Sequence, residues 1–177
     1  NAFFCVVFLC LLALIILLQF NLLTIVLGAS SMLLAFAYPF MKRFTYWPQL
    51  FLGLTFNWGI IMGWTSITNN MSIEPFILYI AAIFWTLGYD TIYGAQDIID
   101  DEIIGIKSTS LKFKNNIKLF VSLCYLISSI LMISLFYGKI NINYSSIFIL
   151  IFFLTLLYQI IIFNRKEPKK CLRAFKL

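Results

Sequence analysis

Residues 2–40 read AFFCVVFLCLLALIILLQFNLLTIVLGASSMLLAFAYPF and contain no charged residue. As a single helix this stretch would be roughly 60 Å long, about twice the thickness of the hydrocarbon core of a bilayer. The chain therefore has to fold back within it. The only polar interruption is Gln19 with Asn21, which indicates a tight turn between two helices over about 2–18 and 22–40.

The composition of the whole chain places it in a membrane. Of its 177 residues, 62% are hydrophobic and 11% are charged, whereas average soluble domains have about 45–50% apolar and about 25% charged residues. A soluble fold of this size would lack the polar side chains needed to cover its surface. The chain also has no histidine, which excludes a histidine-based catalytic triad or metal site within it.

Further apolar stretches indicate four more membrane spans, over about 48–67, 75–92, 117–137 and 145–163, followed by a basic tail, 164–177. The prediction is an all-α, polytopic membrane helix bundle. Six crossings place 12 of the 13 Lys and Arg residues on one side and only Lys139 on the other. Such asymmetry marks the cytoplasmic side, or the matrix side in an organelle. The net charge of +6 then indicates a lipid bilayer as partner and no nucleic acid.

Acidic residues gather after the fourth span. Five of the seven fall within thirteen positions: Asp90, Asp97, Asp100, Asp101 and Glu102. If the helix continues, offsets of three, seven and eleven place four residues on one stripe: Asp90, Tyr93, Asp97 and Asp101. Neighbouring carboxylates repel unless they share a cation, and Mg²⁺ takes one or two carboxylates together with substrate phosphates. Asp97, Asp100 and Asp101 are therefore candidate ligands of a Mg²⁺–diphosphate site; the alternative is a solvated acidic helix end.

Basic residues flank this acidic segment in the predicted topology. Lys42 and Arg43 precede the third span, and Lys107 follows the acids. Facing a site mouth, they would bind a diphosphate, for which arginine offers a planar pair of donors. The alternative is that they only set the topology of the chain.

Two long strings resemble a known family. The first comprises YDTIY at 89–93, Asp97, Asp100-Asp101 and IGIKST at 104–109. It resembles the second aspartate-rich motif of the UbiA superfamily of intramembrane aromatic prenyltransferases. The second, YPFMKRFTYWPQ at 38–49 together with FNWG at 56–59, resembles the 4-hydroxybenzoate polyprenyltransferase branch, which serves ubiquinone synthesis.

The resemblance implies a bundle of nine transmembrane helices with a cavity opening toward the cytoplasmic side. It implies Mg²⁺-dependent transfer of a polyprenyl group from polyprenyl diphosphate to 4-hydroxybenzoate, ortho to the hydroxyl, in a bacterial or mitochondrial inner membrane. The residues that it assigns to catalysis or metal binding are Asp97, Asp100, Asp101, Tyr93, Arg43 and Lys107. Those assigned to substrate binding are Asp90, Lys42 and Asn57. For Asn57, helix–helix hydrogen bonding is the alternative role.

The sequence departs from the family pattern in one respect. The family also has a first aspartate-rich motif, but no acidic residue precedes Glu74 here. With six spans in place of nine, residues 1–177 are predicted to be a single incomplete prenyltransferase domain, inactive in isolation. The alternatives are a related enzyme with another aromatic acceptor, an ion-coupled transporter and a structural subunit. A transporter favours acids near mid-span, whereas these acids follow the span.

Overall fold

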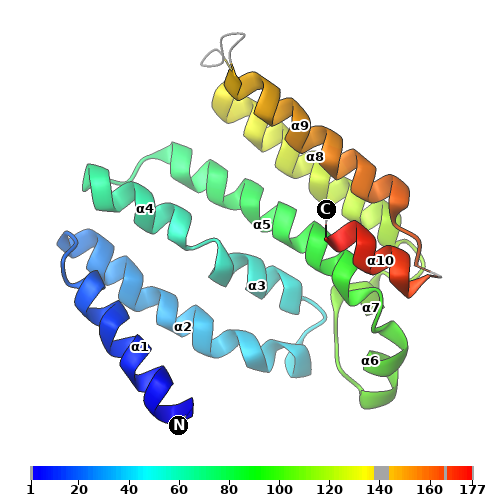
Figure 1. The fold of residues 1–177 in the computed structure, drawn as a ribbon, viewed down its shortest axis with the longest axis horizontal. Helices are drawn as coiled ribbons and strands as arrows, with labels where there is room; N and C mark the ends of the chain where they lie inside the picture. The colour runs from blue at the N-terminus through cyan, green and yellow to red at the C-terminus, as the bar shows by residue number, and fades with distance from the viewer. Residues whose placement is uncertain (1, 138–143, 166, 177) are drawn as a thin grey trace.

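A computed structural model of the chain describes residues 2–137, 144–165 and 167–176, and this part of the chain is helical with short connections (Figure 1). The helices are α1 (Ala2–Leu17), α2 (Leu22–Phe44), α3 (Pro48–Phe56), α4 (Gly59–Thr68), α5 (Ile73–Gly94), α6 (Ile98–Ile104), α7 (Thr109–Lys112), α8 (Ile117–Phe136), α9 (Tyr144–Ile162) and α10 (Pro168–Phe175). The predicted all-α membrane bundle is confirmed.

Each of the six apolar stretches is helical, and among the described residues four segments are long and apolar enough to cross a bilayer. These are Leu22–Phe44, Pro48–Thr68, Ile73–Gly94 and Ile117–Phe136, while Ala2–Leu17 and Ser146–Ile162 are shorter apolar helices. Phe3 and Phe4 of α1 are about three-quarters exposed. In a membrane protein such apolar surface contacts lipid or other apolar helices.

The third predicted span is broken in its middle, where α3 ends and α4 begins. The side chain of Asn57 lies in this break and is buried. Its amide nitrogen donates to the carbonyl of Gly53 at 2.9 Å and to the hydroxyl of Thr86 on α5 at 2.8 Å. The break therefore faces a neighbouring helix that satisfies its polar groups, as non-helical backbone at membrane depth requires.

Helix α5 is the centre of the fold. Figure 1 shows it between α3 and α4 on one side and α8 and α9 on the other, and it packs against α3, α4 and α8. The approach to α8 is close at Gly88, where an added Cβ would lie 2.3 Å from the ring of Tyr125. Small residues permit such close contacts between membrane helices.

The acidic segment does not continue the helix α5. The prediction that one continuous helix carries Asp90, Tyr93, Asp97 and Asp101 on a single face is therefore wrong. Helix α5 ends at Gly94, a turn follows, and the acids after Asp97 belong to the separate helix α6. At Gly94 an added Cβ would lie 2.7 Å from the hydroxyl of Ser110, so the returning α7 segment occupies the space beside the end of α5. Helix α6 then ends at Gly105, whose φ of 76° is a left-handed conformation that glycine adopts without strain.

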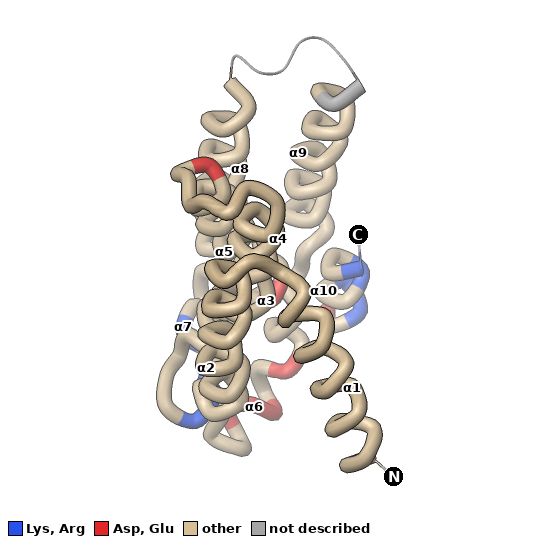
Figure 2. The backbone as a smooth tube through the Cα atoms, turned by 90° about the vertical axis from the view of Figure 1, so that its left-hand side faces the viewer, with Lys and Arg blue, Asp and Glu red and all other residues tan. Residues whose placement is uncertain are grey.

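The predicted basic tail contains the amphipathic helix α10. Cys171 and Ala174 on one face have no exposed surface, whereas Lys170 and Arg173 are exposed. The buried face packs against α5 and α9. Figure 2 shows the charged residues gathered at the end of the bundle where α6, α7 and α10 lie, here called the charged end. Glu74 lies at the opposite end, in the first turn of α5.

Candidate functional site

A buried polar network fixes the segment that follows the acidic helix. The side-chain oxygen of Gln49 on α3 accepts the backbone N–H of Thr109 at 3.0 Å. The hydroxyls of Thr109 and Thr91 lie 2.7 Å apart, and Ser110 donates to the carbonyl of Thr91 at 2.8 Å. Gln49 is 4% exposed, and both threonines are fully buried. Because hydrogen bonds are strong in a low-dielectric interior, this network holds the start of α7 against α3 and α5.

The other end of the acidic segment is joined to α2. The backbone N–H of Lys107 donates to the carbonyl of Lys42 at 2.9 Å, and the Lys107 ammonium donates to the carbonyl of Phe44 at 3.3 Å. The same ammonium lies 5.5 Å from the centre of the Tyr46 ring, within the range of a cation–π contact. The two sequence strings 38–49 and 104–109 therefore meet in space.

Asp101 is the best-enclosed carboxylate of the acidic helix. Partial burial raises its pKa, while the nearby Lys42 ammonium and a hydrogen bond from Ser108 lower it. Asp97 and Asp100 lie close enough to raise the pKa of Asp101 further by repulsion. Three carboxylates therefore act on one another at the start of α6.

Lys42 links this cluster to the end of α5. Its ammonium interacts electrostatically with Asp90 as well as with Asp101. It lies in the last turn of α2, beside Arg43, where a cation is favoured by the helix dipole. The structure thus brings together acids from α5 and α6 around one cation from α2, residues separated by more than forty positions in the chain.

A cavity of about 570 Å³ opens beside this cluster. Asp101 and Glu102 line it together with three lysines, Lys107, Lys112 and Lys114. Lys114 pairs with Glu102. The cavity therefore offers carboxylates for a cation and ammonium groups for an anion, the combination that a metal–diphosphate complex requires.

The remaining predicted site residues, Tyr93, Arg43 and Asn57, do not line the cavity beside α6. Tyr93 is 40% exposed and its ring packs against Phe175 of α10, with ring centres 4.7 Å apart. Arg43 is exposed beside Lys42. Asn57 makes the helix–helix hydrogen bond to Thr86 that its alternative role requires. The catalytic role of Tyr93 and Arg43 and the substrate-binding role of Asn57 stay predictions.

Whether a metal ion fits this site can be judged from the side chains that could act as its ligands. In the described part of the chain, no three Asp, Glu, His or Cys side chains converge into a metal site. Two carboxylates completed by phosphate oxygens are nevertheless the usual protein share of a Mg²⁺ site. Asp97 and Asp100 already raise the pKa of Asp101 by repulsion, which a shared cation would relieve. Asp101 with Asp97 or Asp100 thus offers the two carboxylates for a Mg²⁺ whose other ligands come from substrate.

Three residues that hold the site in place received no role from the sequence. Gln49, Thr91 and Thr109 all lie within the two resembling strings. The signal in the sequence was a polar residue at the edge of an apolar span, because a buried polar side chain nearly always has a hydrogen-bond partner. Their partners lie 18 and 60 positions away.

A family model matches the full length of the chain, and individual known proteins match part of it. The sequence model described as the UbiA prenyltransferase family matches residues 1–177. Over 115 residues the chain is 56% identical to the protein of Arabidopsis thaliana named 4-hydroxybenzoate polyprenyltransferase, mitochondrial. It is 53% identical over 114 residues to the Homo sapiens protein of that name, and 52% over 111 residues to that of Caenorhabditis elegans.

These matches cover part of each protein. They span 63%, 63% and 62% of this chain, and 28%, 30% and 31% of the Arabidopsis, human and Caenorhabditis relatives, respectively. The chain thus matches less than a third of the length of these curated relatives. No solved structure matches it significantly.

Proposed function

Since the chain belongs to the UbiA prenyltransferase family, we propose that the protein containing it transfers a polyprenyl group from a polyprenyl diphosphate to the ring of 4-hydroxybenzoate. The match of the family model to all 177 residues carries this proposal. The identity of about half the aligned residues to proteins named 4-hydroxybenzoate polyprenyltransferase supports the choice of acceptor. The mixed acidic and basic lining of the cavity beside α6 fits a diphosphate substrate.

The reaction proceeds by loss of diphosphate from the prenyl donor. The bond between the allylic carbon and oxygen breaks, diphosphate leaves with the electron pair, and an allylic carbocation remains. The ring carbon ortho to the hydroxyl of 4-hydroxybenzoate attacks this cation, and the proton on that carbon passes to the released diphosphate. Water has to be kept from this cation, because it would otherwise capture it.

The acidic residues of α6 hold the metal in this proposal. Asp97 and Asp101 are the ligands, and Asp100 lies beside them. Mg²⁺, when bound, supplies Lewis-acid stabilisation of the charge on the departing diphosphate. Lys42 lies near Asp90 and Asp101, and its ammonium favours the ionised form of Asp101 against the effect of burial on its pKa.

The basic residues of the charged end bind the anions. Lys107 lines the cavity next to Asp101, and its backbone is anchored on α2, so its ammonium is positioned before substrate binds. Lys107 and Arg43 contact the diphosphate or the carboxylate of the aromatic acceptor. Such preorganised charges stabilise the leaving group without the cost of reorganisation during the reaction.

The proposed location is an inner membrane, with the charged end facing the mitochondrial matrix or the bacterial cytoplasm. The excess of Lys and Arg at that end supports the orientation. The matched relatives carry the word mitochondrial in their names, which favours the mitochondrial membrane.

The test is prenyl transfer to labelled 4-hydroxybenzoate in membranes that contain the full-length protein. It is run with Mg²⁺ and with a chelator, for the wild type, Asp97→Asn and Asp101→Asn. Product is expected only from the wild type with Mg²⁺. Glu74→Gln, which removes an acid from the opposite end of the bundle, is the matched control and should retain activity.

Other outcomes separate the parts of the proposal. Product from a well-folded protein with a different aromatic acceptor, but not with 4-hydroxybenzoate, would retain the family and replace the substrate. Full activity of Asp97→Asn would remove Asp97 from the metal ligands. The isolated 177 residues, which carry no acid before Glu74, should give no product; turnover by them would contradict the need for a first acidic motif.

A further inference from the structure

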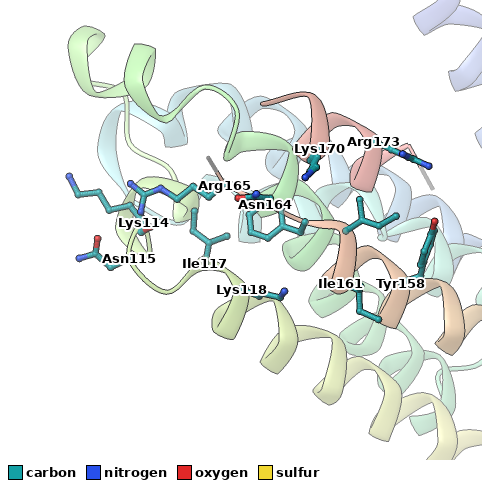
Figure 3. A pocket seen from close by; sticks show the side chains of 12 residues that line it. Lys114, Asn115, Ile117, Lys118, Tyr158, Ile161, Asn164, Arg165, Lys170 and Arg173 are labelled. Atoms are coloured by element: carbon teal, nitrogen blue, oxygen red, sulfur yellow. Dashed lines mark hydrogen bonds between the residues drawn. The ribbon is translucent and has the colours of Figure 1, made fainter. Parts of the chain in front are cut away.

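A second cavity lies at the charged end, between the start of α8, the end of α9 and α10. Its volume is about 690 Å³, and Figure 3 shows the side chains that surround it. Five of these are basic: Lys114, Lys118, Arg165, Lys170 and Arg173. No Asp or Glu is among the residues that line it. This cavity is called the basic pocket below.

The described ion pairs leave part of this positive charge unmatched. Lys114 pairs with Glu102, and Lys170 pairs with Glu167 at 2.8 Å. Among the described residues, Lys118, Arg165 and Arg173 make no ion pair, and all three side chains are exposed. A cluster of like charges that the protein does not neutralise attracts an anion.

The dipoles of α8 and α10, which both begin at the pocket, act in the same direction, whereas α9 ends there and its dipole acts against an anion. Lys118 lies in the first turn of α8, which begins at Ile117, and Lys170 lies in the first turn of α10, which begins at Pro168. The positive end of a helix dipole disfavours a cation in its first turn and favours an anion. An anion between these two helix starts would relieve both unfavourable placements.

One wall of the basic pocket is apolar and continues along the membrane face of α9. Ile162 and Phe163 line it near the charged end, and Tyr158 and Ile161 lie up to one turn farther into the span. Ile161 is 72% exposed and Tyr158 46% exposed. The ligand that fits has an anionic head among the basic residues and apolar chains against α9.

We propose that the basic pocket binds the headgroup of an anionic glycerophospholipid, with its acyl chains lying along the exposed face of α9. Basic pockets between membrane helices at the positive side take such headgroups. Helix α10 supports this role, because it presents Lys170 and Arg173 outward while Cys171 and Ala174 bury its other face. Because its apolar face packs on α5 and α9, α10 holds these two cations at the charged end of the bundle.

The basic pocket is separate from the acidic cavity beside α6 but adjacent to it. Lys114 lines both cavities, and its ammonium pairs with Glu102. Arg165 donates to the carbonyl of Lys114. A lipid phosphate bound by Arg165 would therefore lie next to the segment that joins α7 to α8.

The experiment titrates phosphatidylglycerol onto the purified full-length protein in neutral detergent and counts bound lipid by native mass spectrometry. Phosphatidylcholine, inorganic phosphate and farnesyl diphosphate are titrated in parallel. Phosphatidylglycerol should bind more tightly than phosphatidylcholine and inorganic phosphate, and added salt should weaken its binding. Farnesyl diphosphate should leave it bound.

The test variant is Lys118→Gln with Arg173→Gln, which removes two of the three pocket charges that make no ion pair among the described residues and leaves Arg165, which donates to the carbonyl of Lys114. A loss of affinity for phosphatidylglycerol of roughly tenfold to thirtyfold is expected, because each basic residue near a phosphate contributes about a fivefold factor. The matched control is Lys169→Gln with Lys176→Gln, which removes two exposed charges from the same tail but outside the pocket. The control should bind as the wild type does. If the double variant fails to fold, Lys118→Gln alone should lose about fivefold.

Three results would overturn the proposal. Equal losses in the test and control variants would mean that surface charge in general attracts the lipid. Inorganic phosphate binding as tightly as phosphatidylglycerol would show that the apolar wall contributes nothing. Displacement of the lipid by farnesyl diphosphate, sensitive to Lys118 and Arg173, would assign the pocket to the prenyl donor. Because the readout is lipid binding, these results do not depend on prenyl transfer.

Discussion

The backbone N–H of Lys107 donates a 2.9 Å hydrogen bond to the carbonyl of Lys42. This contact joins the loop after the acidic helix α6 to the last turn of α2, and so brings together two segments 65 positions apart in the chain. Because it is made by backbone atoms, the side chains of both lysines remain available. The ammonium of Lys42 interacts electrostatically with Asp90 and Asp101, while Lys107 lines the acidic cavity.

The ionised form of Asp101 is expected to destabilise the metal-free protein. Partial burial raises its pKa, so the stability that the protonated form contributes is present below the unfolded pKa of about 3.9 and is lost as pH rises through the folded pKa. Asp101→Asn should therefore raise Tm at neutral pH without Mg²⁺, and leave it unchanged below about pH 3. Thermal unfolding of the full-length protein across this range is the measurement.

The control for Asp101 is its exposed neighbour Asp100. Asp100→Asn removes the same charge from the same helix, and a smaller gain in Tm is expected because its side chain is more exposed to water. An equal gain in both variants would assign the effect to general repulsion within α6. A lower Tm for Asp101→Asn at neutral pH would contradict the argument from burial.

Mg²⁺ with inorganic diphosphate should stabilise the protein against unfolding. A ligand present at a hundred times its Kd contributes about 2.7 kcal/mol to the free energy of unfolding. The gain in Tm should disappear with a chelator and in Asp97→Asn and Asp101→Asn, whereas Glu74→Gln should keep it. Stabilisation of Asp97→Asn equal to that of the wild type would exclude Asp97 as a ligand.

Thr109→Val should weaken the buried network and so lower both the stability and the activity of the protein. Thr91 donates its hydroxyl proton to the carbonyl of Leu87 at 2.6 Å, so Thr109 is the donor in the 2.7 Å contact between the two hydroxyls. Valine keeps the shape but not the donor, and the loss should be about 1 kcal/mol in the free energy of unfolding. Denaturant unfolding and prenyl transfer of the full-length protein are measured in parallel.

The control variant for Thr109→Val is Thr55→Val. Within the described part of the chain, the hydroxyl of Thr55 bonds to the carbonyl of Phe51 in its own helix, at 2.8 Å, and to no other helix. This change should therefore have about half the effect or less on stability and none on activity. If Thr109→Val is destabilised but retains its kcat, the network supports the fold without positioning the acidic helix.

Gly88→Ala should be strongly destabilising because α5 and α8 touch there. Its added Cβ would lie 2.3 Å from the ring of the fully packed Tyr125, and overpacking of this kind costs about 1–3 kcal/mol. Gly63→Ala is the matched control, since an added Cβ there meets nothing within 4 Å and alanine is the better helix former. Equal Tm values for the two variants would contradict the close packing of α5 on α8.

The sequence predicted the lengths and positions of the main helices well because a bilayer imposes them. Each span must satisfy its own backbone hydrogen bonds, so a long apolar run has to be a helix. That reasoning predicted the turn near Asn21, the apolar span that forms α5 and the concentration of charged residues at one end. The two motif strings likewise identified Asp101, Lys42 and Lys107 as candidates for one site.

What needed the tertiary structure was every feature that depends on a partner far along the chain. Hydropathy did not show that α5 ends at Gly94, where Ser110, sixteen positions further along the chain, packs against that glycine. Nor did it show that the third span breaks at Asn57, whose amide is satisfied by Thr86 on another helix. Hydropathy and charge are properties of a local stretch, whereas hydrogen bonds and close packing belong to pairs of residues. For this protein the sequence therefore determined which segments form apolar helices and which end carries the charge, and the tertiary contacts decided how that end is shaped into a candidate site.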